Sequence, residues 1–470
     1  MDRVYDKAYE RASRAWSGME AFRASRLRCK RYVFGDQWGD AITVGDRMVT
    51  EREFIMSQGQ VPLKNNLLRR ILRNVIGIYR SNYLVTEADK EDDGESGATA
   101  AKLARSRIFR INRMEDLVPR MLEEFLISGL SAVRIEAGSD GDPRILPVTS
   151  DNFFFHSDGY DPRGWDVDMV GEVHEIGYGT LLSRFCRNAG DFERLESIFG
   201  DKGRAGEPCR LVEVWHKDTS VFGAIHDKKR GVLRLRRMED LGGSLYGGGE
   251  NGIHHGKEDV RSIVRSGWRC CWYASDGTLL SSSPMAGGHP YVFRAYPFID
   301  GEVHGYVGDI IDQQRYVNRL ITLYDFIMKS SAKGVLLFPD ESIPRDMTLQ
   351  DVADEWSRFN GVIPFRAQPG VPLPTQVSGN AANIGITELL KIEMQMLEDI
   401  SGISPTLQGR LETTSTSGTL FAHQNAAAQT SLLDLLRTFD SHVKEIGDCV
   451  THKVKFRQLQ QEKIIYSDNC

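Results

Sequence analysis

One stretch of this sequence limits the possible folds more than any other, an amphipathic segment from Gly305 to Ala332. Apolar and aromatic residues recur through it at helical spacing, from Val307 to Met328, and polar residues lie behind them. A single helix over this stretch would be a rod of roughly 40 Å, at about 1.5 Å per residue. Such a long single helix cannot bury both of its sides alone, so we predict that copies of the chain pack side by side.

Two further helical patterns follow, and a polar segment separates them. The pattern in "ITELLKIEMQMLEDISGIS" stops at Gly402 and Pro405, and the last one starts near Leu420 and continues through Val450. Between them, the residues from Thr413 to Gly418 favour turns and solvent over a packed core. The sequence therefore predicts an exposed loop between two helices.

The N-terminal part predicts a mixture of helices and strands. Helical patterns cover residues 5–31, a segment opened by Pro62 and Asn65, and residues 98–110 and 114–129. From about 150 to 300 we expect short strands and loops, including a hairpin at Asp276-Gly277. The predicted fold class is α+β.

Composition excludes several classes of protein. The 470 residues are 41% hydrophobic and carry a formal net charge of -6, which argues against gripping nucleic acid through overall positive charge. Seven scattered cysteines fit a reducing compartment. The N-terminus lacks the apolar core of a signal peptide, and no apolar run is long enough to cross a bilayer. The chain is therefore expected to be soluble and intracellular, with no membrane contact.

Catalytic motifs are absent from the sequence, and one cluster alone suggests a site. There is no P-loop, Gly-x-Ser-x-Gly elbow or His-Glu-x-x-His helix. Asp166, Asp168, Glu172 and His174 have even spacing, which puts them on one face of a strand and permits a metal site. A solvated strand face explains them more simply, so we expect no metal, no cofactor and no catalytic residue.

Two other residue pairs are poor ligand candidates. Cys270 and Cys271 should point to opposite faces of a strand, which makes joint metal binding unfavourable. His254 and His255 lie next to a glycine-rich stretch, residues 242–256, for which the sequence suggests no role beyond a loop.

Four stretches together resemble the portal proteins of tailed bacteriophages, most closely those of short-tailed phages. They are "FGDQWGD", "LKNNLLRRILRNVIGIYRSN", "YPFIDGEVHGYVGDIIDQQRYVNRLIT", and "ISGISPTLQGR" followed by "SGTLFAHQNAAAQ". None is specific by itself, but their order and spacing over about residues 30–460 carry the resemblance. The glycine-rich insertion has no counterpart, and the chain ends at Cys470 where many relatives continue.

The resemblance implies a ring, usually of twelve copies, around a channel. It implies the following parts: N-terminal helices and α/β wing, 1–300; stem helix, 301–333; clip, 334–383; returning stem helix, 384–401; channel loop, 402–417; long wing helix and C-terminus, 418–470. Implied partners are double-stranded DNA without sequence preference, a terminase motor, the major capsid protein and a tail or adaptor protein. The implied place is one capsid vertex of the virion, after assembly in the cytoplasm of the host.

Two groups of site residues follow from the resemblance. The channel loop would face DNA through Arg410, Thr413, Thr414, Ser415 and Thr416, and its hydroxyls would give weak contacts that do not brake sliding. Lys329 and Lys333 would lie near the channel exit. Simpler alternatives stay open, namely a surface linker for the loop and favourable charge at a helix C-terminus for the lysines.

Two other functions compete with a DNA channel. One is a metal-dependent nuclease or hydrolase that uses Asp166, Asp168 and His174. The other is an adaptor that binds proteins through its long helices and never touches DNA.

Overall fold

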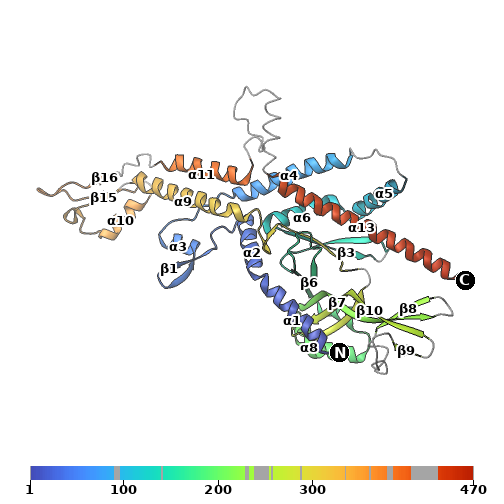
Figure 1. Ribbon diagram of the computed structural model, residues 1–470. Helices are drawn as coiled ribbons and strands as arrows, with labels where there is room; N and C mark the ends of the chain where they lie inside the picture. The colour runs from blue at the N-terminus through green and yellow to red at the C-terminus, as the bar shows by residue number, and fades with distance from the viewer. Residues whose placement is uncertain are drawn as a thin grey trace, which may run out of the picture. The chain divides into compact units, whose positions relative to one another are not determined.

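The computed structural model describes most of the chain (Figure 1). The described residues are 2–88, 96–138, 141–227, 232–237, 253–255, 258–285, 288–333, 335–358, 361–377, 385–403 and 432–468. They form two compact units, of which unit 1 comprises Met1–Lys30, Val75–Gly308 and Thr430–Cys470, and unit 2 comprises Arg31–Asn74 and Asp309–Gln429.

Unit 1 is built on two antiparallel sheets. The larger has the strand order β11-β10-β7-β6-β5, with β8 on β7 and β9 on β10, and the smaller has the order β12-β3-β4. The bounds of the larger sheet are β5 Phe153–Ser157, β6 Val167–Ile176, β7 Cys209–Asp227, β8 Val232–Arg237, β9 Ile253–His255, β10 Glu258–Ala274 and β11 Leu279–Met285. Those of the smaller are β3 Leu130–Ala137, β4 Pro143–Val148 and β12 Tyr291–Ala295. A short hairpin, β13 Pro297–Ile299 and β14 Glu302–Val303, follows β12.

An aromatic core joins the two sheets of unit 1. Phe153 and Phe155 of β5 pack against Phe293 of β12, with ring centroids 5.2 and 4.7 Å apart. Trp215 of β7 and Trp272 of β10 belong to the same buried cluster. Alternating side chains of each sheet thus fill the space between the two layers, as a pleated strand requires.

Helices cover the outer surfaces of unit 1. Helix α1 lies on β5, β6 and β7, α6 packs on β3, and α13 packs on α5 and β12. The bounds are α1 Asp2–Gly18, α2 Glu20–Phe34, α5 Ser96–Ile111, α6 Met114–Ser128, α7 Tyr178–Phe185, α8 Ala189–Ala205 and α13 Leu433–Asp468.

Unit 2 contains the α9–α11 helix pair and two small hairpins. Helix α9, Ile311–Lys333, packs along α11, Ile386–Ser401. The remaining elements are β1 Ala41–Val44, β2 Arg47–Thr50, α3 Glu51–Ser57, η3 Gly308–Ile310, β15 Val335–Leu337, η4 Asp340–Ser342, α10 Leu349–Ser357 and β16 Thr375–Val377. Helix α4, Leu67–Ala88, begins in this unit.

Several sequence-based predictions are confirmed. The Asp276-Gly277 hairpin joins β10 and β11, and α5 and α6 match the predicted helices at 98–110 and 114–129 within two residues. Helix α11 ends at Gly402, whose φ of 64° suits a left-handed C-cap. Along α13, Leu435, Phe439 and Val443 are buried as their helical spacing indicates. The mixture of helix and strand fits the predicted α+β class.

Other predictions are wrong. The helix expected over 5–31 is two helices, interrupted at Met19 after a helix-weakening glycine. The strands expected to be short include β7 and β10, which pair over sixteen positions. The long helix begins later than Gly305, at Ile311, and a Cβ at Gly305 would lie 2.1 Å from the Ile127 carbonyl oxygen. That glycine instead brings the chain close to the end of α6 before α9 begins.

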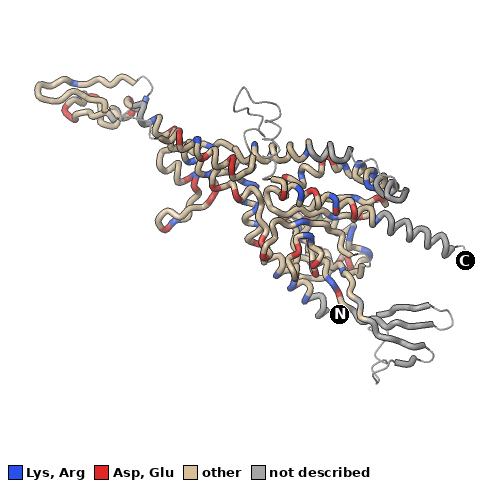
Figure 2. Tube along the Cα trace, turned by 45° about the horizontal axis from the view of Figure 1, so that its top comes forward, with Lys and Arg blue, Asp and Glu red and all other residues tan. Residues whose placement is uncertain are grey.

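None of the described helices contains an apolar stretch long enough to span a membrane. Figure 2 shows acidic and basic residues interspersed along the described elements.

Candidate functional site

The predicted channel loop lies outside the described residues. This applies to Arg410, Thr413, Thr414, Ser415 and Thr416, and to the segment on either side of them, 404–431. The two predicted exit lysines lie at the end of α9. Lys329 pairs with Asp325 one turn earlier, at 2.6 Å, and its side chain is exposed. Lys333 is the last residue of α9, and its side chain is outside the described set.

An apolar stripe remains exposed on the α9–α11 pair. Ile392, Met396 and Ile400 follow one another at every fourth residue of α11, and they are 53%, 44% and 43% exposed. Helix α9 contributes a second group of exposed large side chains, Tyr316, Leu323, Tyr324, Phe326 and Met328. Residues four apart share one helix face, so α11 presents a continuous apolar line. Exposed apolar stripes of this kind mark interaction surfaces.

The segment that connects α9 with α11 has a small α/β structure. Strands β15 and β16 pair antiparallel, from Val335↔Val377 to Leu337↔Thr375. Helix α10 carries a capping box in which Thr348 and Asp351 satisfy each other's backbone N–H groups. Val362 and Leu373 are 80% and 64% exposed, so this segment also offers apolar surface.

A ladder of polar side chains on α9 holds the start of α4. The side-chain amide nitrogen of Gln314 donates to the carbonyl oxygen of Asn65 at 2.8 Å, and its oxygen accepts from the N–H groups of Leu67 and Leu68 at 2.9 and 3.2 Å. One turn later, the Asn318 oxygen accepts from the N–H of Asn65 at 3.0 Å. These contacts satisfy the N–H groups of Asn65 and Leu68, and they give a second acceptor to the Leu67 N–H, which also donates to the Asn65 carbonyl oxygen at 2.9 Å.

The ladder continues for another turn, and "FGDQWGD" completes it. Thr322 accepts from the N–H of Leu63 at 3.1 Å, and the indole N–H of Trp38 donates to the Leu63 carbonyl at 3.1 Å. Asn318 donates to the Gln37 side chain at 2.7 Å. Three of the stretches that carried the family resemblance therefore meet in one polar cluster. Gln314 and Asn318 belong to the polar residues that lie behind the apolar stripe of α9, and both are fully buried.

A buried carboxylate contacts α9 beside the ladder, one residue further round the helix. Glu51 is 2% exposed and accepts from Arg319 Nε at 2.6 Å and from Arg315 at 3.2 Å. Burial opposes the charge of Arg315, but Tyr32 and Glu51 raise its pKa above the ordinary value. Glu51 thus ties α3 to α9 within unit 2.

The four residues predicted as a possible metal cluster do not come together. Asp166 precedes β6 and accepts from Ser157 and from the N–H groups of Gly159 and Asp161, so it closes a turn. Asp168 pairs with Arg11 and with His156. The even spacing is therefore misleading for Asp166 and Asp168, whereas Glu172 and His174 do lie close together, 3.8 Å apart.

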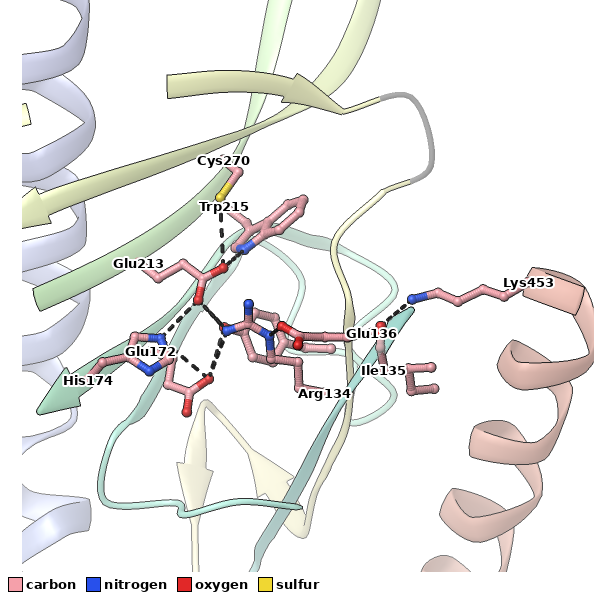
Figure 3. A network of polar contacts seen from close by, with 10 residues as sticks. Arg134, Ile135, Glu136, Glu172, His174, Glu213, Trp215, Cys270 and Lys453 are labelled. Atoms are coloured by element: carbon pink, nitrogen blue, oxygen red, sulfur yellow. Dashed lines mark hydrogen bonds and ion pairs between the residues drawn. The ribbon is translucent and has the colours of Figure 1, made fainter. Parts of the chain in front are cut away.

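Glu172 and His174 join a buried network that links both sheets of unit 1 (Figure 3). At its centre is Glu213, 1% exposed, which pairs with Arg134 and with His174 Nε2 at 2.9 Å. The Tyr291 hydroxyl lies 3.1 Å from Glu172 Oε2 and 3.3 Å from Glu213 Oε2.

Further contacts extend this network to its surroundings. The Trp215 indole N–H donates to Glu213 at 2.8 Å, and the Lys453 ammonium group of α13 donates to the Ile135 carbonyl, as Figure 3 shows. Cys270 Sγ lies 3.8 Å from Glu213, whereas Cys271 belongs to the core cluster on the other sheet face, as predicted. Arg134 and Glu213 could not be identified from the sequence, because cross-strand partners leave no local pattern.

The electrostatics of the network suit a structural junction. Burial raises the pKa of Glu172. Burial also opposes ionisation of Glu213, but hydrogen bonds from His174 and the charge of Arg134 hold its pKa below the ordinary value. Glu172, His174 and Glu213 offer ligand atoms within 4.8 Å of one another. The Arg134 guanidinium already contacts both carboxylates, so a cation occupies the position that a metal would need.

Comparison with known proteins agrees with the earlier resemblance. A search among curated proteins found no match. A family model described as "Phage P22-like portal protein" matches residues 9–454. That range includes the polar ladder, the α9–α11 pair and the buried network of unit 1. The match extends over nearly the whole chain, and the chain therefore belongs to the P22-like portal protein family of phages.

Proposed function

We propose that copies of this portal protein assemble into a closed ring of about twelve chains around a channel for double-stranded DNA. The observation that carries the proposal is the apolar stripe of Ile392, Met396 and Ile400. Neighbouring chains in a ring would cover this stripe, which a single chain leaves in water.

The parts of the chain receive roles in this ring. Helices α9 and α11 form the stem, residues 334–383 the clip, and unit 1 most of the wing. The loop 402–417 faces DNA, and Lys329 and Lys333 lie towards the channel exit. The ring sits at one capsid vertex, assembles in the cytoplasm of the host, and contacts the terminase motor, the major capsid protein and a tail or adaptor protein. ATP hydrolysis comes from a partner, because the sequence has no P-loop.

Mass photometry and negative stain test the ring directly. The wild-type chain should give particles of about twelve copies with a central hole. Met396→Glu combined with Ile400→Glu should shift the distribution to monomers, because two charges would be buried at the contact. Lys391→Glu is the matched control, since this side chain is 67% exposed and pairs only with Glu388 in the described contacts. A wild-type chain that stays monomeric at high concentration would contradict the proposal.

We further propose that the chain has no catalytic activity of its own. Alanine at Asp166 and at His174 should remove no nuclease or ATPase activity, because the wild-type ring should have none to lose. Metal-dependent DNA cleavage that disappears in these variants would favour the hydrolase alternative.

A further inference from the structure

A groove of about 920 Å³ lies in unit 1, between α1–α2 and the β13–β14 hairpin. Its floor is apolar and includes Met19, Phe22 and Phe298. One wall carries the carboxylates of Asp300 and Glu302, which belong to the hairpin. Glu302 is 74% exposed and meets only His304 in the described ion pairs. The groove therefore combines apolar surface with a rim of accessible negative charge.

The backbone around this groove is strained. Four described non-glycine residues have positive φ, and three of them line the groove: Tyr160 at 54°, Phe298 at 56° and Asp300 at 53°. Side chains other than glycine rarely adopt this region, and such residues gather where a structure clamps a ligand or partner. Tyr160 and Phe298 are bulky residues that rarely adopt this region, whereas Asp300 with Gly301 suits the turn of a two-residue hairpin.

A ring restricts what can occupy the groove. In a closed ring of identical chains, each copy presents one surface to the preceding copy and a different surface to the next. A groove used in this contact must find its complementary surface elsewhere on the same chain. This step rests on the ring proposed above.

Helix α5 carries the complementary surface. Leu103, Arg107 and Arg110 occur at spacings of four and three residues, so they share one exposed helix face. Leu103 is 67% exposed, and the Arg107 side chain is 62% exposed in a surface ion pair with Asp142. Exposed pairs of this kind contribute little, so Arg107 can exchange its partner. Helix α5 packs beside α13 and α6, whereas the groove lies at α1–α2 and the β13–β14 hairpin, so different elements form the two surfaces.

We propose that α5 of one copy docks in the α1–β13 groove of the next copy. Leu103 contacts the apolar floor, and Arg107 and Arg110 face Asp300 and Glu302. The opposite wall is basic through Arg14, which fixes the orientation of the docked helix because its arginines must face the hairpin. An amphipathic helix in an apolar groove is a common mode of protein recognition.

Charge reversal on each surface, alone and together, tests the contact in the full-length chain. The groove variant is Asp300→Asn with Glu302→Lys, in which Asn tolerates the positive φ of residue 300. The α5 variant is Arg107→Glu with Arg110→Gln. Each should raise the concentration for half-maximal ring assembly at least roughly tenfold, and the variant with all four changes should recover most of that loss. Mass photometry across a dilution series measures the assembly.

Matched controls change the same charge on the exposed surface of α8. They are Lys202→Glu with Arg204→Gln, and Glu193→Lys with Asp201→Asn, and both should assemble as the wild type does. Leu103→Ser tests the α5 face without a charge change, and thermal unfolding confirms that each variant is folded. The proposed contact would be overturned if rings form normally in either single-surface variant. It would also be overturned if the variant with all four changes assembles no better than the single-surface variants. The ring proposal is tested separately, by the wild-type particle.

Discussion

Gln314 gives the most direct test of the polar ladder. Its side chain accepts from the N–H groups of Leu67 and Leu68, which are 6% and 0% exposed. Gln314→Ala leaves the buried Leu68 N–H without an acceptor, at a cost of about 1–3 kcal/mol, whereas the Leu67 N–H keeps the Asn65 carbonyl oxygen at 2.9 Å. We expect local stability at the start of α4 to fall by about 1–3 kcal/mol, which corresponds to a roughly 5- to 150-fold loss of amide protection.

Hydrogen exchange measured by mass spectrometry on peptides covering residues 63–72 is the assay. A local readout is needed because a chain with two compact units does not unfold in one step. Gln313→Ala is the matched control: it is the same substitution one residue earlier, at an oxygen that accepts no hydrogen bond among the described contacts. If both variants exchange equally fast over these peptides, the ladder does not support α4 and the reasoning fails.

Three further predictions concern charge and the channel. Burial raises the pKa of Glu172 in the folded state. The protonated side chain therefore contributes to the stability of the fold below the unfolded pKa, about 4.3, and this contribution is lost as pH rises through the folded pKa. Glu172→Gln should therefore gain stability relative to wild type between pH 4 and pH 7 in thermal scans, whereas Glu175→Gln, at an exposed position, should show no such trend. Lys329→Gln with Lys333→Gln should lower DNA packaging or retention while rings still form. Unchanged packaging would mean that these lysines only supply favourable charge at the C-terminus of the helix. Deleting Thr413 to Thr416 should leave rings intact and give heads that lose DNA or contain too little of it; normal filling would make the loop a plain connector. Two lysines placed in the loop should slow packaging, and this defect should become smaller as the salt concentration rises.

Periodicity identified the helices that bury one continuous face. In α13, Phe439 and Ile446 are fully buried at the predicted spacing, because a helix that packs on one side has apolar residues at helical spacing along that side. Helical periodicity gave no information on the burial of Gln314 and Asn318. Polar residues at helical spacing are typical of a solvent-exposed helix face. Here they are buried because they form hydrogen bonds with the backbone of residues 63–68.

Strand partners were beyond sequence analysis for a different reason. The length of β7 and β10 follows from their mutual pairing, which joins residues about fifty positions apart. Likewise, the period of two placed Glu172 and His174 together but gave no sign of Arg134 or Glu213. The channel-loop residues and the exit lysines were proposed from the resemblance alone, because local pattern carries no information about them, and they stay predictions.

The ladder on α9 also fixes the register of this helix against residues 63–68. Gln314, Asn318 and Thr322 repeat at every fourth residue, and each holds a different backbone group between Leu63 and Leu68. A shift of α9 by one residue would rotate all three away together, by about 100°. The helix can meet the same segment again only after a step of four residues, about 6 Å along its axis. Any axial displacement of α9 against residues 63–68 would therefore have to proceed in steps of about four residues.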